Sequence, residues 1–220
     1  MTNRSVRPVE PLVQEIDEGL TGVLTDNVLA SALREGSASL PNLRSLLSAE
    51  AFCLMTETAA YGLLAARYPN RPAADLWGSM VHLVAEARPV LTAAAISLGM
   101  TEADLMPRPP AHGVFPVCSA MSWMALHGSQ ASSALAVYAE LTAYARQCAL
   151  LAASLRDKGP AGSDEVLGYY ADLDLQALAT LAVDVADDGL RAGDDPQTAL
   201  ATATTLRSKL PEFWAGTAGA

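Results

Sequence analysis

Residues 127–156 read HGSQASSALAVYAELTAYARQCALLAASLR, with no proline and a single glycine. Alanine, leucine, glutamine, glutamate and arginine fill most of this stretch, and all of them favour helices. Ser129 can cap the N-terminus of a helix, and Gly159 and Pro160 follow where such a helix would end. The stretch therefore predicts one long helix that begins after Ser129 and reaches Arg156.

Glycine and proline divide the rest of the chain into further helical blocks. No segment alternates between apolar and polar residues with period two, so strands are not expected. We predict an all-α bundle of seven helices that forms a single domain over residues 1–220, with residues 1–10 flexible. Besides the long helix, the expected helices span residues 11–33, 40–68, 72–98, 114–126, 163–191 and 196–214.

The composition is that of a folded, acidic protein. Hydrophobic residues make up 51% of the 220 residues and charged residues 17%, which excludes intrinsic disorder. The net charge of −10 disfavours nucleic acids and anionic membrane surfaces as partners. The longest uncharged stretch, residues 113–139, is interrupted by Pro116 and by the polar residues 127–130, so no membrane span is expected. We therefore predict a cytoplasmic protein whose partner is a small-molecule substrate.

Cysteine and histidine are scarce. The three cysteines, Cys53, Cys118 and Cys148, form no C-x-x-C pair, so neither a zinc site nor a disulfide framework is indicated. His112 lies in a proline-rich loop and His127 precedes a glycine, so both are expected to be ordinary loop or cap residues. Function is then expected from polar side chains that face the interior of the bundle.

Two carboxylates lie on apolar faces of the expected helices. Glu140 and Asp174 each have apolar residues three and four positions away. A lone buried carboxylate is costly, so it must be paired, bound to a metal or protonated. Two alternatives stay open: Asp174 could be exposed on an acidic helix, and Glu140 could form a structural salt bridge with Arg146 or Arg88.

The helices expected over residues 40–68 and 72–98 also carry polar candidates. Glu50 lies among leucines, which predicts an interior position. His82 and Glu86 are four residues apart and therefore share one helix face. An exposed ion pair within the helix is the alternative to a functional role for these two residues.

Three stretches carry a family resemblance. Residues 33–47 read LREGSASLPNLRSLL, residues 134–141 read ALAVYAEL after His127-Gly128-Ser129, and Phe213-Trp214 lies close to the end of the chain. In order and spacing they resemble the motifs G-x-L-P…L-R-x-Y-L, G-S…C-x-W-x-Y-x-E-I-G and E-x-x-F-W of TenA/PqqC-type proteins, although each motif is degenerate. Those proteins belong to the haem-oxygenase-like superfamily of seven-helix bundles. The resemblance implies a homodimeric enzyme that transforms a small organic molecule in the bundle interior, in bacterial specialised metabolism.

The resemblance also implies the site residues. Acid and base carboxylates would act without a bound haem, because no histidine occupies an axial position on the first helix. The nucleophilic cysteine of the thiaminases falls at Ala134, and an alanine cannot supply a thiolate, so covalent thiaminase chemistry is excluded. The implied catalytic residues are Glu140, Asp174 and Tyr170, and the implied substrate-binding residues are Tyr138, Tyr144, Glu50 and Trp77.

Two further functions stay open at this point. One is a non-haem iron oxidase or oxygenase that acts on an amine- or acid-containing substrate, and iron is the one cofactor that the resemblance suggests. The other is a non-catalytic family member that acts as a binding or partner protein. Tyr170 and Ala177 stand where the iron-dependent branch carries histidines, which favours the metal-free enzyme. If a metal is bound, the implied ligands are His82, Glu86, Glu140 and Asp174.

Overall fold

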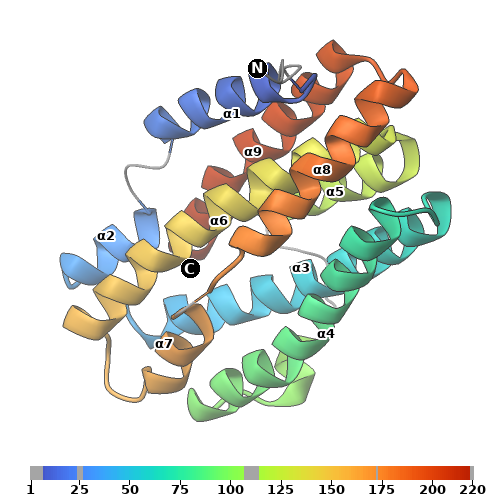
Figure 1. The fold of residues 1–220 in the computed structure, drawn as a ribbon. Coiled ribbons are helices and arrows are strands. Elements are labelled where there is room, and N and C mark those ends of the chain that lie inside the picture. The colour runs from blue at the N-terminus through green and yellow to red at the C-terminus, as the bar shows by residue number, and fades with distance from the viewer. Residues whose placement is uncertain (1–6, 24–26, 107–113, 172, 219–220) are drawn as a thin grey trace.

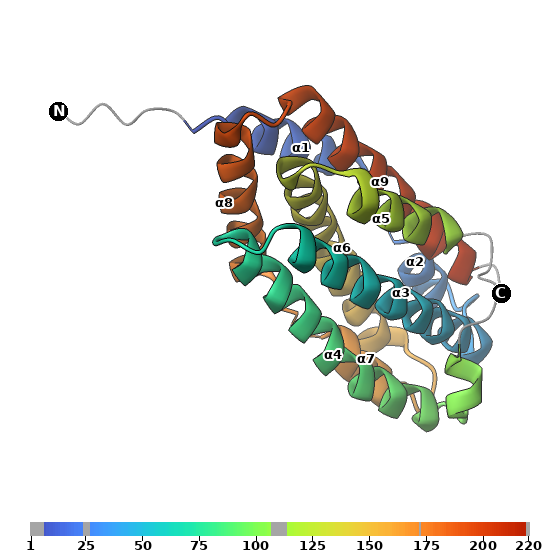
Figure 2. The same cartoon turned by 90° about the vertical axis from the view of Figure 1, so that its right-hand side faces the viewer.

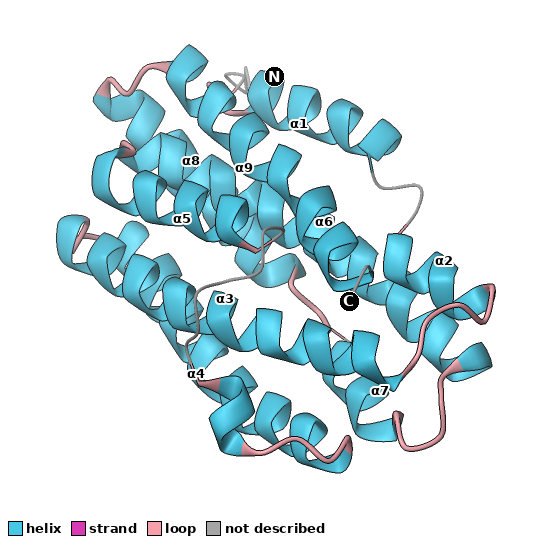
Figure 3. Cartoon of the chain, turned by 180° about the vertical axis from the view of Figure 1, so that it is seen from behind, coloured by secondary structure: helices cyan, strands magenta, loops and turns pink. Residues whose placement is uncertain are grey.

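The computed structural model describes residues 7–23, 27–106, 114–171 and 173–218, and it is helical throughout (Figures 1 and 3). In these ranges the chain forms nine α-helices, one short 3-10 helix and no strand, so the all-α prediction is confirmed. The helices are α1 (Glu10–Val23), α2 (Val28–Arg34), α3 (Leu40–Arg67), α4 (Ala73–Ser97), η1 (Glu102–Leu105), α5 (Phe115–His127), α6 (Gln130–Lys158), α7 (Asp164–Tyr170), α8 (Gln176–Ala192) and α9 (Pro196–Ala218).

The predicted helix starts at Ser129 and Ser39 are confirmed. The Ser129 hydroxyl accepts a hydrogen bond from the backbone N–H of Ser132 at 3.2 Å, as an N-cap residue should. At the start of α3, the Asn42 side chain accepts the backbone N–H of Ser39 at 2.9 Å, and a proline occupies the first turn. Both long helices therefore begin where local side-chain chemistry places them.

Two expected helices are each divided in the structure, which is why nine helices replace the predicted seven. The helix expected over residues 163–191 is interrupted, because the chain leaves the helical conformation after Tyr170 and resumes it at Gln176. Similarly, α2 begins after Asn27, whose side chain accepts the backbone N–H of Ala30 at 3.0 Å. Side chains that bond to the nearby backbone offer it an alternative to a continuous helix.

Helix α6 runs through the middle of the bundle (Figure 1). Every residue from Ala131 to Leu141 is buried, and α6 packs most extensively against α9 and α8. On the other side, α3 and α4 pack against each other along their length (Figure 2). The backbones of α3 and α6 stay further apart than those of these neighbouring pairs, and side chains bridge the space between them.

The N-terminal segment, for which flexibility was expected over residues 1–10, is described from residue 7 onward. Val9 is fully buried, and its backbone N–H donates a hydrogen bond to Asp187 at 3.4 Å. Arg7 forms an ion pair with Asp184 at 2.8 Å. Arg7 and Val9 therefore contact α8, and residues 1–6 lie outside the described part of the chain.

Among the described residues, no helix combines the length and the apolar character that crossing a membrane requires.

Candidate functional site

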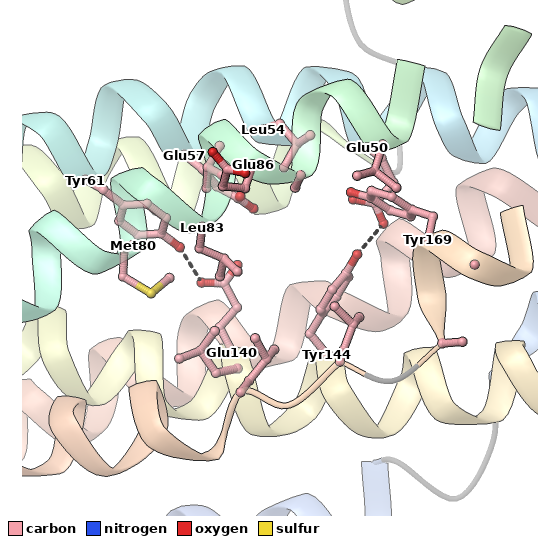
Figure 4. A pocket seen from close by; sticks show the side chains of 18 residues that line it. Glu50, Leu54, Glu57, Tyr61, Met80, Leu83, Glu86, Glu140, Tyr144 and Tyr169 are labelled. Atoms are coloured by element: carbon pink, nitrogen blue, oxygen red, sulfur yellow. Dashed lines mark hydrogen bonds between the residues drawn. The ribbon is translucent and has the colours of Figure 1, made fainter. Parts of the chain in front are cut away.

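A cavity of about 330 Å³ lies between α3, α4, α6 and the α7 region (Figure 4). Its polar lining consists of four glutamates and three tyrosines, and the rest of the lining is apolar. The polar side chains are Glu50, Glu57, Glu86, Glu140, Tyr61, Tyr144 and Tyr169; the other lining residues are Leu54, Met80, Leu83, Val84, Ala87, Val90, Leu141, Gly168, Ala171, Leu173 and Leu175.

Glu140 reaches the cavity from α6 and meets Tyr61 of α3. The residue is only 7% exposed, and its Oε2 accepts a hydrogen bond from the Tyr61 hydroxyl at 3.3 Å. Burial raises the pKa of Glu140 to about 7, although the Tyr61 hydrogen bond favours the ionised form and lowers it in part. Near neutral pH this carboxyl group therefore exists in both protonation states.

Glu50 forms a second carboxyl–tyrosine group toward the other end of the cavity (Figure 4). It is 4% exposed, and its Oε1 accepts hydrogen bonds from the hydroxyls of Tyr144 at 2.8 Å and Tyr170 at 3.1 Å. Burial raises the pKa of Glu50 to about 7 against the opposing effect of these two hydrogen bonds. The cavity thus holds two carboxyl groups that titrate in the physiological range.

Glu57, Tyr61 and Tyr169 line the cavity but were not among the predicted site residues. Glu57 is partly exposed, and burial followed by the charges of Glu140 and Glu50 raises its pKa well above the ordinary value. A signal for two of the three existed, because residues 50, 57 and 61 follow a helical spacing of seven and four and so share one face of α3. Tyr169 gave no such signal.

Asp174 does not lie with Glu140, and the prediction of an interior acid–base pair is wrong on this point. Asp174 is exposed in the loop between α7 and α8, where its carboxylate accepts the backbone N–H of Gln176 at 3.1 Å. It belongs to a shallower outer pocket that also contains Tyr138 and Arg146. The helical periodicity that placed Asp174 on an apolar face does not apply, because the residue is not helical.

The aromatic residues implied by the resemblance divide between the cavity and its surroundings. Tyr138 points to the outer pocket and donates a hydrogen bond to Asp17 at 2.8 Å. Trp77 is fully buried and does not line the cavity, but its ring stacks on Tyr61 with centroids 6.3 Å apart. Tyr170 is also buried, behind the lining. Neither Trp77 nor Tyr170 therefore belongs to the lining of the cavity.

The implied iron ligands do not converge. Glu86 and Glu140 line the cavity, whereas His82 is exposed and lies outside the lining, as does Asp174. Within the described ranges, no three histidine, cysteine or acidic side chains are placed to hold one metal ion. His112, expected to be a loop residue, lies outside these ranges. The residues present do not fit the iron centre of the oxidative alternative.

The cysteines are buried away from the cavity lining. Cys53 and Cys118 bring their Sγ atoms to 3.7 Å, and the hydrogen bond with Cys118 together with burial raises the pKa of Cys53. Burial also raises the pKa of Cys148. Ala134 is fully buried in α6. The Cys53 contact lowers the pKa of Cys118, but no described cysteine belongs to the lining of the cavity.

No family model and no curated protein matches this chain in sequence. Solved structures do match in fold. A TenA homologue from P. horikoshii superposes with a TM-score of 0.74 at 15% identity, over 96% of this chain and 98% of that chain. A TenA homologue from Pyrococcus furiosus gives a TM-score of 0.71 at 14% identity, over 94% and 98% of the two chains. One from Pseudomonas syringae pv. tomato gives 0.75 at 11% identity, over 96% and 92%.

These neighbours define the fold of the chain. It is the TenA-like, haem-oxygenase-like helical fold that the motifs at residues 33–47 and 127–141 suggested.

Proposed function

We propose that this protein is an enzyme that transforms a small organic molecule in the cavity between α3, α4 and α6. The observation that supports the proposal is a pair of buried glutamates, Glu50 and Glu140, each held by tyrosine hydroxyls and each with a pKa of about 7. General acid–base catalysis is most effective when the pKa of the catalytic group lies near the working pH. Two such groups in one cavity can take a proton from a ligand and return one to it.

Glu140 is the first candidate for proton transfer. Its Oε2 is held by Tyr61, and no described residue donates a hydrogen bond to its Oε1. That oxygen can therefore receive a proton from a bound molecule. Tyr144 and Tyr170 both bond to the Oε1 atom of Glu50, which leaves the Oε2 atom of Glu50 in the equivalent position.

Tyr170 then acts as a positioning residue and not as a catalytic one. It lies behind Glu50, packs edge-on against Tyr169 with ring centroids 4.8 Å apart, and fixes the orientation of the Glu50 carboxyl group. Glu57 is a third carboxyl group of the cavity, and burial followed by the charges of Glu140 and Glu50 disfavours its ionisation. The proposal involves no covalent thiol step, because the cysteines lie outside the cavity lining.

The setting of this enzyme also remains a proposal. A cytoplasmic homodimer in bacterial specialised metabolism agrees with the TenA-like fold and with the acidic composition. Light scattering of the purified protein at micromolar concentration checks the oligomeric part, since a dimer has twice the 22.9 kDa mass of the chain. A monomeric mass would contradict it.

Turnover of a metabolite mixture tests the enzymatic part. The wild-type protein and Glu140→Gln are incubated with a bacterial small-molecule extract, and mass spectrometry follows which compounds disappear. Glu212→Gln is the matched control, because Glu212 is exposed on α9, outside the cavity lining, and its side chain pairs with Lys209. We expect a compound that the wild type and the control consume and that Glu140→Gln leaves. Compounds that bind in the cavity but are left unchanged by the wild type would support a non-catalytic binding protein instead.

A further inference from the structure

When its carboxyl groups are ionised, the polar wall of the cavity consists almost entirely of hydrogen-bond acceptors. Among the described lining residues there is no lysine, arginine, histidine, asparagine, glutamine, serine, threonine or tryptophan. The polar groups are carboxyl groups and phenol hydroxyls only. A ligand that complements this wall must bring its own donors.

The tyrosine hydroxyls do not change this balance. Tyr61 donates its hydrogen to Glu140, and Tyr144 donates its hydrogen to Glu50, so both phenol oxygens offer lone pairs to other groups. Of the three lining tyrosines, Tyr169 alone has a hydroxyl with no hydrogen bond to a described residue. The lining therefore supplies one free phenol donor against several acceptors.

Two carboxylate oxygens that face the cavity accept no hydrogen bond from the described chain. They are Oε1 of Glu140 and Oε2 of Glu50, in side chains that are more than nine-tenths buried. Because the two side chains have little contact with solvent, ionising them is costly unless a cation or a hydrogen-bond donor compensates. No cationic side chain of the described lining compensates the charge of the ionised carboxyl groups, so a cationic ligand can supply it.

The two carboxyl groups enter from opposite helices and face different ends of the cavity (Figure 4). Glu140 and Tyr144 are one turn apart on α6, and the Tyr144 hydroxyl donates a hydrogen bond to Glu50 on α3. Apolar side chains, among them Leu54 and Leu83, line the space along with these groups. Glu57 also lines the cavity between the two ends (Figure 4), so a complementary ligand carries a cationic donor at each end.

We propose that the cavity binds a small aliphatic diamine, with one ammonium group at Glu140 and the other at Glu50. The assignment deepens the proposed function and rests on it for the location of the site. A metal ion is a poorer complement, because no three ligating side chains in the described ranges converge on one point. A neutral molecule brings no positive charge to the ionised carboxyl groups, and an anionic molecule is repelled by them.

Binding of such a ligand is coupled to proton release. The titratable groups around the ligand are Glu50 and Glu57 from α3, Glu86 from α4, Glu140 from α6, and the lining tyrosines. Glu50 and Glu140 are partly protonated near neutral pH and must ionise to pair with ammonium groups. Aliphatic amines stay protonated in this range, so the affinity should rise as the pH increases from about 6 to about 8.

Calorimetry with three matched probes tests the proposal: diaminobutane, butylamine and butanediol. We expect the diamine to bind roughly tenfold or more tightly than the monoamine, because the second charge-assisted hydrogen bond is lost in the latter. The diol should show no binding at millimolar concentration. The heat of diamine binding should also change with the ionisation enthalpy of the buffer, which reports the released protons.

Variants locate the ligand. Glu140→Gln and Glu50→Gln should each weaken diamine binding roughly tenfold or more, and Glu212→Gln should not. Leu83→Lys, which places a fixed ammonium group at the lining of the cavity, should also weaken it without altering either carboxyl group. The probe series uses the wild-type protein alone, so its result stands even if one of these variants fails to fold.

Specific results overturn the inference. They are equal affinity for the diol and the diamine, equal affinity for the monoamine and the diamine, or no detectable diamine binding at millimolar concentration. Failure of the proposed function has a different signature. If a diamine binds but is never transformed, diamine binding is supported and the proposed enzymatic activity is contradicted. If a neutral molecule is turned over in a Glu140-dependent way, the enzymatic activity is supported and diamine binding is contradicted.

Discussion

Hydrogen bonds from a tyrosine hydroxyl to a carboxyl group lie on two sides of α6, one facing the cavity and the other facing the outer pocket. Toward the cavity, tyrosine hydroxyls donate to Glu140 and Glu50; toward the outer pocket, the Tyr138 hydroxyl donates to Asp17. The inner carboxyl groups are buried without a cation in the lining, whereas the outer pocket contains exposed Arg146. Burial, and not the tyrosine–carboxyl pair itself, brings a carboxyl pKa close to 7.

Three leucines separate these two settings. Leu141, Leu173 and Leu175 line both the inner cavity and the outer pocket, so they form the wall between them. Asp174, in the exposed loop between α7 and α8, lines the outer pocket. We therefore predict that substitutions at the cavity carboxyl groups and tyrosines alter proton transfer and carboxyl pKa values, and that matched substitutions in the outer pocket do not.

The largest expected difference is in turnover of whichever substrate the extract screen identifies. Glu140→Gln removes the proton-transfer group and should lower kcat by about 10²- to 10⁴-fold. Asp174→Asn, on the outer side, should change kcat by less than about twofold, because surface substitutions of this kind have small effects. Steady-state kinetics of both variants measure the difference. A large loss in Asp174→Asn with none in Glu140→Gln would reverse the assignment of the two faces.

The next largest effect is on stability as a function of pH. Between pH 4.5 and about 7, the folded protein keeps Glu50 and Glu140 protonated while the unfolded chain ionises them. The folded state therefore binds more protons, and the free energy of unfolding falls as the pH rises through this window. Each carboxyl group accounts for a change on the order of 3 kcal/mol.

Urea denaturation of the wild type and Glu140→Gln at several pH values measures this effect. The variant should be more stable than the wild type above pH 7 and about equal to it near pH 4.5. The difference between the two proteins cancels the contributions of the other titratable groups. If the free energies of unfolding of the two proteins changed with pH in parallel, the pKa of Glu140 would not be raised in the folded protein.

A smaller effect is expected from the tyrosines. Tyr61→Phe removes the hydrogen bond that favours ionised Glu140, so the pKa of Glu140 should rise further, by about one unit or less. The acid limb of the pH–rate profile should move to higher pH accordingly. Tyr138→Phe is the matched variant on the outer face and should leave the profile in place. Equal shifts in both variants would contradict the separation of the two faces.

Much of the fold could be predicted from local sequence signals. The caps at Ser39 and Ser129 and the absence of period-two segments were sufficient to define an all-α chain with two long helices. The breaks before α2 and α8 were missed, because Asn27 and Asp174 bond to the backbone only two to three residues further on. Such short-range competition is decided by a single hydrogen bond and leaves little trace in the hydrophobic pattern.

The site could be predicted only in part. Glu140 and Glu50 were identified because a carboxylate with apolar neighbours on its helix face must be buried with a compensating interaction. Asp174 failed this reasoning because its neighbours lie on a different element. The bonds from Tyr61 to Glu140 and from Tyr144 to Glu50 join residues 79 and 94 positions apart, and no local pattern reports such distances.

The central claim is that two cavity glutamates titrate near neutral pH, and a carboxyl-carbon NMR titration tests it directly. The protein is labelled with glutamate carrying ¹³C at the side-chain carboxyl group, and the Glu50→Gln and Glu140→Gln variants assign the two signals. We predict that both signals move with pKa midpoints of about 7, well above the ordinary range of a glutamate carboxyl group. Midpoints in that ordinary acidic range for both Glu50 and Glu140 would contradict the account.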